Sequence, residues 1–352
     1  MKKHNFSAGP SILPQVVLEQ ASKAILNFNN LDLSLIEISH RSADFVAVME
    51  KAQKLTLELL GLENKGYSVL FLQGGASLQF LMVPYNLMKV NGKGAYIDTG
   101  VWSAKAIKEA KLLGDVEVIA SSKDQNYNYI PKKYKVPSEA DYLHCTSNNT
   151  IFGTQIKDFP RTDMSLVCDM SSDIFSRVLD FAQFDLIYAG AQKNMGPAGT
   201  TLVVVKDEIL GKTGRTIPSM LDYSVHINSE SMYNTPSVFA VYVSMLTLQW
   251  LKDMGGIAAM EKINNAKAKL LYDEIDHNPN FKGTAALEDR SHMNVTFLIE
   301  DAEKATKFDA LCKAAGISGI KGHRSVGGYR ASIYNAMPME SVQVLVDMMK
   351  KI

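Results

Sequence analysis

Short apolar runs alternate along the first two thirds of the chain with longer segments whose apolar residues recur every three or four positions. The first pattern is typical of buried strands and the second of helices that cover them. Strands are predicted at residues 67–72, 94–98, 116–120, 142–146, 165–170, 186–191 and 200–205. Helices are predicted at residues 14–28, 44–60, 77–88 and 103–113. Asp44 is the expected cap of the second helix, and Gly61 ends it. This alternation indicates an α/β domain with a mostly parallel sheet covered on both faces.

The pattern changes at the pair Gly255 and Gly256, between a long apolar helix at 237–253 and a charged helix at 257–275. Beyond this pair, strands are predicted at 293–299 and 328–334, and helices at 304–315 and 339–350. These elements form a small α+β domain. We therefore predict a large domain at residues 15–255 and a small C-terminal domain at residues 256–352. The small domain also takes up the N-terminal segment, residues 1–14.

Composition excludes several classes of function. Among 352 residues there are 37 Lys+Arg and 37 Asp+Glu, so the formal net charge is zero. A neutral chain lacks the positive footprint that nucleic acid or an anionic membrane surface requires. The three cysteines, Cys145, Cys168 and Cys312, are far apart and give no disulfide framework and no metal-ligand spacing. No apolar segment follows the basic start of the chain, so we expect no signal peptide and a cytoplasmic location. We also expect no bound metal.

A lysine ends the apolar run at residues 186–191. Gln192, Lys193 and Asn194 begin a glycine-rich turn that leads to the next apolar run. In surroundings of low dielectric constant a lysine amine loses its proton more readily and can attack a carbonyl carbon. Taken alone, a lysine that reaches from the strand edge into water is the commoner interpretation. Other residues of the chain decide between a buried, reactive lysine and an exposed one.

Three other predicted strands end in, or are followed by, residues that could bind a ligand or take part in a reaction. Gly74 and Gly75 lead into a helix start, whose free N–H groups favour a phosphate, although an ordinary turn would look the same. Trp102, one of two tryptophans, follows a strand and could stack on a planar ligand or fill the core. Asp169 lies among apolar residues, where a carboxylate either caps a helix or meets a cationic ring nitrogen.

Together these groups match the needs of pyridoxal 5′-phosphate. Lys193 would react with its aldehyde, Asp169 would keep its ring nitrogen protonated, and Trp102 would stack on the ring. Gln192 and backbone amides would hold the phosphate. A dinucleotide cofactor is disfavoured, because no G-x-G-x-x-G motif follows a strand.

A second group of residues suits an anionic substrate. Between Ala310 and Met339 there is no Asp or Glu, whereas Arg324 and Arg330 are present. Guanidinium groups bind carboxylate and phosphate through paired hydrogen bonds. From the residues alone, a basic surface exposed to water explains this segment as well as a binding site for an anion does.

Five segments resemble the phosphoserine aminotransferase family, and the match spans nearly the whole chain. They are FSAGP at 6–10, SHR at 39–41, GAQKNMGPAG at 190–199, NTP at 234–236 and GHRSVGGYRASIYN at 322–335. The resemblance implies a fold-type I pyridoxal-phosphate transferase with a sheet of the seven-stranded type. It also implies a homodimer with two active sites at the subunit interface.

The resemblance further implies a role for each matching residue. Lys193 matches the lysine joined to the cofactor, Asp169 the partner of the ring nitrogen and Trp102 the stacking residue. The other matching cofactor positions are Ala76, Ser77, Thr150 and Gln192, together with Asn234 and Thr235 from the other subunit. Arg330 matches the clamp for the substrate α-carboxylate. The site for the distal phosphate or carboxylate matches His40, Arg41, His323 and Arg324, some of which would reach across the interface. Many relatives have glycine at position 76 and arginine or cysteine at position 77.

The expected activity is reversible amino transfer between L-phosphoserine and 2-oxoglutarate, with 3-phosphohydroxypyruvate and glutamate as the other pair. It would serve serine biosynthesis, and the family's link to pyridoxine biosynthesis suggests phosphohydroxythreonine as a further substrate. A serine–pyruvate or alanine–glyoxylate aminotransferase is the nearest alternative and would not need the cations at positions 40, 41, 323 and 324. A catalytically idle binding protein with the same fold is a second alternative, which the intact set of Lys193, Asp169 and Trp102 disfavours.

Overall fold

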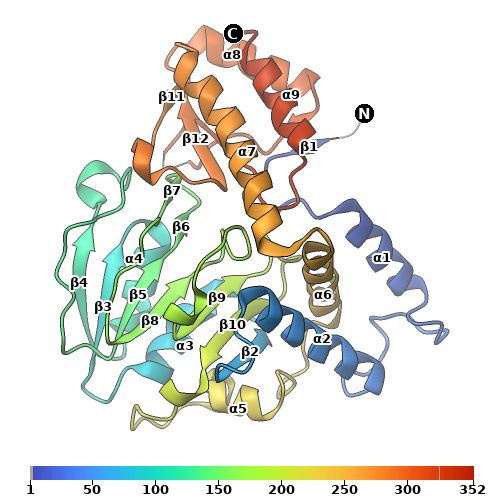
Figure 1. Cartoon of the computed structure of the whole chain (residues 1–352), viewed down its shortest axis with the longest axis vertical. Coiled ribbons are helices and arrows are strands. Elements are labelled where there is room, and N and C mark those ends of the chain that lie inside the picture. The colour runs from blue at the N-terminus through green and yellow to red at the C-terminus, as the bar shows by residue number, and fades with distance from the viewer. Residues whose placement is uncertain (1–2, 325) are drawn as a thin grey trace.

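The computed structural model describes residues 3–324 and 326–352. A seven-stranded sheet forms the centre of the larger lobe (Figure 1). Its strands are β2 (Tyr67–Leu72), β3 (Lys93–Asp98), β4 (Asp115–Ser121), β5 (Tyr142–Thr146), β8 (Ser165–Asp169), β9 (Leu186–Gly190) and β10 (Thr201–Lys206). They follow the order β2-β10-β9-β8-β5-β3-β4, and β10 alone in this sheet runs antiparallel to its neighbours. The predicted α/β class with a mostly parallel sheet is confirmed.

Helices cover both faces of this sheet. They are α1 (Gln15–Leu26), α2 (Ala43–Leu60), α3 (Gly75–Leu87), α4 (Val101–Ala110), α5 (Tyr223–Asn228) and α6 (Val238–Asp253). Successive residues of a strand point to opposite faces. In β2, Val69 and Phe71 enter the core beneath α2 and α6, whereas Leu70 and Leu72 enter the core beneath α3 and α4. The strands read as continuous apolar runs because both faces are buried.

The smaller lobe is built on its own sheet and its own core. Its elements are α7 (Gly256–His277), β11 (Lys282–Gly283), β12 (Asn294–Leu298), α8 (Ala302–Ala314), β13 (Ile317–Ser318), β14 (Tyr329–Ser332) and α9 (Met339–Met349). Strand β12 pairs with β11 and β14, and the N-terminal β1 (His4–Asn5) pairs with β13. Phe6 is fully buried in this second core. A separate core supports the predicted division into domains at residue 255, which stays a prediction.

Short elements complete the fold. They are β6 (Asn148–Asn149), β7 (Thr154–Gln155) and the 3₁₀ helices η1 (Lys123–Gln125), η2 (Phe181–Gln183), η3 (Asp207–Ile209), η4 (Ser219–Leu221) and η5 (Leu287–Asp289). Among the described residues, no helix combines the length and apolar character needed to cross a bilayer.

Some predicted boundaries were wrong. The cap of α2 is Ser42, whose hydroxyl accepts a hydrogen bond from the Phe45 amide at 3.4 Å, and Asp44 lies inside the first turn. Both residue types suit an N-cap, so composition alone does not separate them. Helix α3 begins at Gly75 rather than Ser77, directly after the left-handed Gly74.

Replacing Gly61 by alanine should destabilise the protein without disturbing any packing. Gly61 ends α2 with φ of +63°, and no atom lies within 4 Å of an added Cβ. The cost is therefore that of placing an L-residue in the left-handed region, about 1 kcal/mol. Chemical denaturation should show a lower midpoint for Gly61→Ala and an unchanged midpoint for Lys51→Ala on the same helix. Equal midpoints for Gly61→Ala and the wild type would contradict this account.

Candidate active site

A cavity of about 390 Å³ lies at the carboxyl ends of the parallel strands. Its walls come from the start of α3, from Trp102 on α4, from the ends of β5 and β8, and from the turn between β9 and β10. The N-terminal segment and Arg330 of β14 close it from the smaller lobe. Parallel α/β sheets bind ligands at this edge because the carboxyl ends of their strands meet there.

Lys193 extends into this cavity from the β9–β10 turn. Its amine donates a hydrogen bond to the Thr150 hydroxyl at 3.0 Å and lies 5.8 Å from the centre of the Trp102 ring. Burial lowers the pKa of Lys193 to about 8, which the Arg330 charge assists and the Asp169 charge opposes. Ser11 fixes the turn from the other side, since its hydroxyl donates to the Lys193 carbonyl at 2.6 Å.

Asp169 is the last residue of β8 and lines the same cavity. Burial raises the pKa of this carboxyl group, whereas the Ser171 amide, which donates to it at 2.9 Å, and the Lys193 charge lower it. The side chain is 3 % exposed. A carboxylate this deeply placed needs a cationic partner, which a protonated ring nitrogen would supply.

Trp102 owes its place to a buried polar turn before α4. The Ser103 hydroxyl donates to the Asp98 carboxylate at 3.0 Å and accepts hydrogen bonds from the Thr99 and Gly100 amides. These bonds fix the first turn of α4, from which Trp102 reaches the cavity.

The start of α3 forms the opposite end of the cavity. Gly75, Ala76 and Ser77 line it, and the first N–H groups of a helix have no partner inside the helix. A Cβ at Gly74 would lie 2.5 Å from a Leu78 carbon, so the sharp entry into α3 requires glycine. Gln192 also lines the cavity. These donors fit a phosphate group.

Buried polar atoms without partners provide a test of the cofactor prediction. Trp102 Nε1, Thr146 Oγ1 and Arg330 Nε are buried and have no hydrogen-bond partner among the described residues. All three residues line the cavity. Buried polar groups are nearly always satisfied, so these atoms point to a polar ligand. An amine, a carboxylate, an aromatic plate and a phosphate cradle in one cavity fit pyridoxal phosphate.

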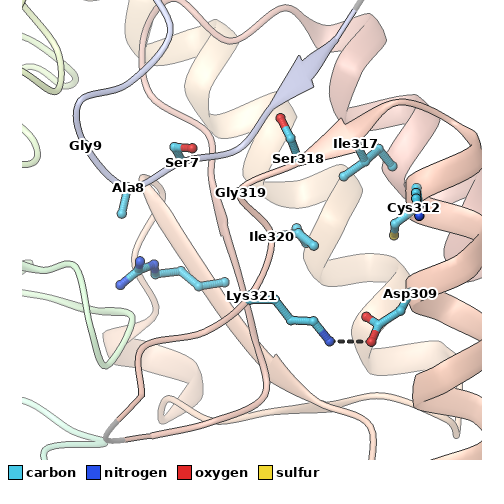
Figure 2. Close-up of a pocket in the computed structure, with 12 residues that line it drawn as sticks. Ser7, Ala8, Gly9, Asp309, Cys312, Ile317, Ser318, Gly319, Ile320 and Lys321 are labelled. Carbon is cyan, nitrogen blue, oxygen red and sulfur yellow. Dashed lines mark hydrogen bonds and ion pairs between the residues drawn. The ribbon is translucent and has the colours of Figure 1, made fainter.

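Arg330 separates this cavity from a wider hollow of about 500 Å³ on the smaller lobe. Figure 2 shows the N-terminal segment with Ala8 and Gly9 along this hollow and the ion pair between Lys321 and Asp309. Asp309 lies just outside the acid-free segment and neutralises Lys321. The hollow contains neither Lys193 nor Asp169, so the chemistry belongs to the smaller cavity.

The structure brings only some of the predicted residues together. His323 and Arg330 line the cavity with the predicted cofactor residues Ala76, Ser77, Trp102, Thr150, Asp169, Gln192 and Lys193. His40, Arg41, Arg324, Asn234 and Thr235 lie outside its lining in this chain. Asn234 instead donates to Gln73 at 2.9 Å, and Arg41 is exposed.

Several lining residues were not predicted. Ser171 and Ser172 lie just beyond Asp169, after Met170, and Asn148 lies just beyond the end of β5. The hydroxyl of Ser171 accepts the Gly190 amide at 3.2 Å and so ties the ends of β8 and β9 together. Polar residues after a strand end are the signal that could have identified them.

This fold and this cavity define a class of protein, the fold-type I pyridoxal-phosphate transferases. Comparison with known proteins agrees. The family model for class-V aminotransferases matches residues 3–345. A phosphoserine aminotransferase of Flavobacterium johnsoniae is 75 % identical over 350 residues, which are 99 % of this chain and 98 % of the relative.

Solved structures give the same result. The phosphoserine aminotransferase of Bacillus circulans subsp. alkalophilus has a TM-score of 0.96 and 44 % identity, covering 99 % of this chain and 98 % of that one. The enzyme of Trichomonas vaginalis, solved with pyridoxal phosphate bound, has a TM-score of 0.94 and 36 % identity, covering 99 % and 100 %. The chain belongs to the class-V aminotransferase family and, within it, to the phosphoserine aminotransferases.

The pH dependence of Lys193 reactivity should reflect its lowered pKa. In cofactor-free protein, reductive methylation of Lys193 by formaldehyde should rise with pH and level off above about 8, because the neutral amine is the nucleophile. Ordinary exposed lysines titrate near about 10.4. Mass spectrometry of the peptide that contains Lys193 measures the rate.

The same pH dependence of Lys193 methylation should be measured in the variant Asp169→Asn. The Asp169 charge raises the pKa of Lys193, so its removal should shift the midpoint to lower pH. A wild-type rate that still climbs beyond pH 10 would show that the amine is not buried as described.

Proposed function

We propose that this protein binds pyridoxal phosphate and catalyses reversible amino transfer between L-phosphoserine and 2-oxoglutarate, in serine biosynthesis. The observation that carries the proposal is one cavity shared by the Lys193 amine, the Asp169 carboxylate and the unpartnered guanidinium nitrogen of Arg330. Membership of the phosphoserine aminotransferases supports the choice of substrate. Use of phosphohydroxythreonine in pyridoxine biosynthesis is a further part of this proposal.

Each residue has a defined task in this reaction. When bound, pyridoxal phosphate supplies an aldehyde carbon and a ring that withdraws electrons from the substrate α-carbon. Lys193, neutral above about pH 8, takes the proton from that α-carbon and returns it later as a general acid. Asp169 would keep a proton on the ring nitrogen, and Trp102 would stack on the ring, since both side chains line the cavity.

Substrate recognition falls to the cations around the mouth of the cavity. Arg330 would bind the α-carboxylate, because its Nε atom has no partner among the described residues and guanidinium groups pair with carboxylates. His323 lines the same cavity and is placed to meet the distal phosphate or carboxylate. One pocket then accepts both substrates in turn, so the kinetics should be ping-pong.

We propose that a second copy of the chain completes the site. His40, Arg41, Arg324, Asn234 and Thr235 lie outside the cavity lining of their own chain, although the family resemblance assigns them to cofactor and substrate. The surface of α1 and the loop after it exposes apolar side chains, including Leu26 at 82 % and Ile36 at 63 %. A homodimer would cover these side chains and deliver some of the missing residues.

A cytoplasmic location is also proposed, because a reducing compartment preserves unpaired thiols. Cys145 and Cys168 lie on adjacent strands as free thiols, with their sulfur atoms 3.6 Å apart.

Loading with pyridoxal phosphate should give a yellow protein, and L-phosphoserine should shift its visible spectrum. Lys193→Ala should lose the visible band, since the amine that reacts with the cofactor aldehyde is absent. Lys105→Ala is the matched control, because Lys105 lies 4.6 Å from the Trp102 ring but outside the cavity. A colourless wild type saturated with the cofactor would remove the proposal. Alanine in place of phosphoserine tests the alternative substrate class.

Mixed dimers test the shared site. Neither Lys193→Ala nor Arg41→Ala homodimers should use phosphoserine well. If Arg41 acts across the interface, a mixed dimer has one fully intact site, so activity should return to about half of the wild-type value per dimer. If Arg41 acts within its own chain, every site in the mixture carries a defect and mixing restores nothing. The two chains are co-expressed, the mixed dimer is separated, and its activity with phosphoserine distinguishes the two cases.

A further inference from the structure

A lysine outside the cavity is buried at the junction of the two lobes. Helix α7 begins in the core of the larger lobe with Ile257 and Met260 and continues into the core of the smaller lobe with Ala268 and Leu271. Lys267 lies where one core gives way to the other, and its side chain is 0 % exposed. A buried cationic side chain is costly, so its retention calls for a specific partner.

The partners of Lys267 are two backbone carbonyl groups. Its amine donates to the carbonyl oxygens of Ile333 at 3.0 Å and Tyr334 at 2.7 Å. Burial lowers the pKa of Lys267 to about 7, and no ion pair to it occurs among the described residues. Both the neutral and the charged amine carry enough N–H bonds to serve the two carbonyl groups. Lys267 therefore acts here as a paired hydrogen-bond donor.

These carbonyl groups belong to the segment that follows Arg330. The next residue, Asn335, donates its amide N–H to the side-chain oxygen of Asn194 at 3.0 Å. Asn194 directly follows Lys193. The side chain of Asn335 also accepts from Asn264 of α7 at 2.9 Å and donates to the Phe175 carbonyl at 3.0 Å. One buried junction thus connects α7, the segment after Arg330 and the turn that carries Lys193.

Arg330 itself has little to fix its side chain. Its Nη1 atom donates to the Thr150 carbonyl at 3.4 Å, and its Nε atom has no partner among the described residues. The position of the guanidinium group therefore depends on how the smaller lobe is oriented against the larger one. Hydrogen bonds at the junction set that orientation close to Lys193.

We propose that Lys267 is a positioning residue for the substrate: by holding the segment after Arg330, it fixes the carboxylate clamp relative to the Lys193 amine. This inference rests on the proposed function, because it takes Arg330 as the clamp. Lys267 touches neither substrate nor cofactor. Its removal should therefore weaken substrate binding while cofactor binding is preserved.

The variants are Lys267→Met, which keeps the chain length but removes both donors, and Lys267→Gln, which keeps two N–H bonds on a shorter side chain. Lys269→Met on the exposed face of α7 is the matched control, where only an ion pair with Asp273 is lost. In the holoenzyme, Lys267→Met should raise KM for glutamate about tenfold with a smaller change in kcat. The KM for glutamate of Lys267→Gln should lie between that of Lys267→Met and that of the wild type.

A double-mutant cycle with Arg330→Lys separates positioning from general stability. If Lys267 acts through Arg330, Lys267→Met should lower kcat/KM by less than about twofold in the Arg330→Lys background. Equal losses in both backgrounds, or a KM unchanged by both Lys267 variants, would overturn the inference. Should Lys267→Met fail to fold, the same cycle is run with Lys267→Gln.

Hydrogen exchange of the cofactor-free protein gives a readout that does not depend on the reaction. Amides of residues 330–335 and 194 should exchange faster in a Lys267 variant than in Lys269→Met, while the seven-stranded sheet stays protected. Uniformly faster exchange would indicate only lost stability and would count against the inference. A wild type that converts no glutamate would instead overturn the proposed function and leave this exchange result standing.

Discussion

The electrostatic relation between Lys193 and Asp169 is the constraint on which the rest of the site depends. Burial lowers the pKa of the amine and raises the pKa of the carboxyl group, and each charge partly offsets the effect of burial on the other. Without the Lys193 charge, Asp169 would be an isolated carboxyl group in an apolar wall and its pKa would rise further. Without the Asp169 charge, the pKa of Lys193 would fall further. The cavity brings both groups within reach of one ligand, because both side chains line its wall.

The order of the strands makes this arrangement possible. Asp169 ends β8 and Lys193 follows β9, and these strands are parallel neighbours whose carboxyl ends meet at one edge. Strand β10 then returns antiparallel beside β9, and Lys193 lies in the connection between them, residues 191–200. Within this connection the amides of Lys193, Met195 and Gly196 donate to the Ala191 carbonyl, and these hydrogen bonds restrain the backbone at the lysine. Ser11 adds a further hydrogen bond to that turn.

The contribution of the smaller lobe is different in kind. It supplies Arg330 and His323 to a cavity whose reactive groups come from the larger lobe. Contact between the lobes near Lys193 is polar, because Asn335 donates its backbone amide to the Asn194 side chain and its side-chain amide to the Phe175 carbonyl. Hydrogen bonds depend on direction as well as distance, so such a junction specifies one orientation where an apolar contact would tolerate several.

The sequence by itself determined the elements and the chemical groups. Strands buried on both faces leave continuous apolar runs. Lys193, Asp169 and Trp102 are recognisable as a set because each lies at or just after the end of such a run, where parallel strands bind ligands. Two-residue strands such as β1 and β13 left no comparable signal, since their pairing is set by residues more than three hundred positions apart.

Only the tertiary structure decided which of the predicted residues share a cavity. His323 lines it and Arg324 does not, although they are adjacent in the chain, because a side chain's direction depends on local backbone geometry. Lys267 gave no sign of its role, since a lysine within a charged helix is usually exposed. Its burial follows from two cores meeting along one helix, which is a property of long-range packing and not of neighbouring residues.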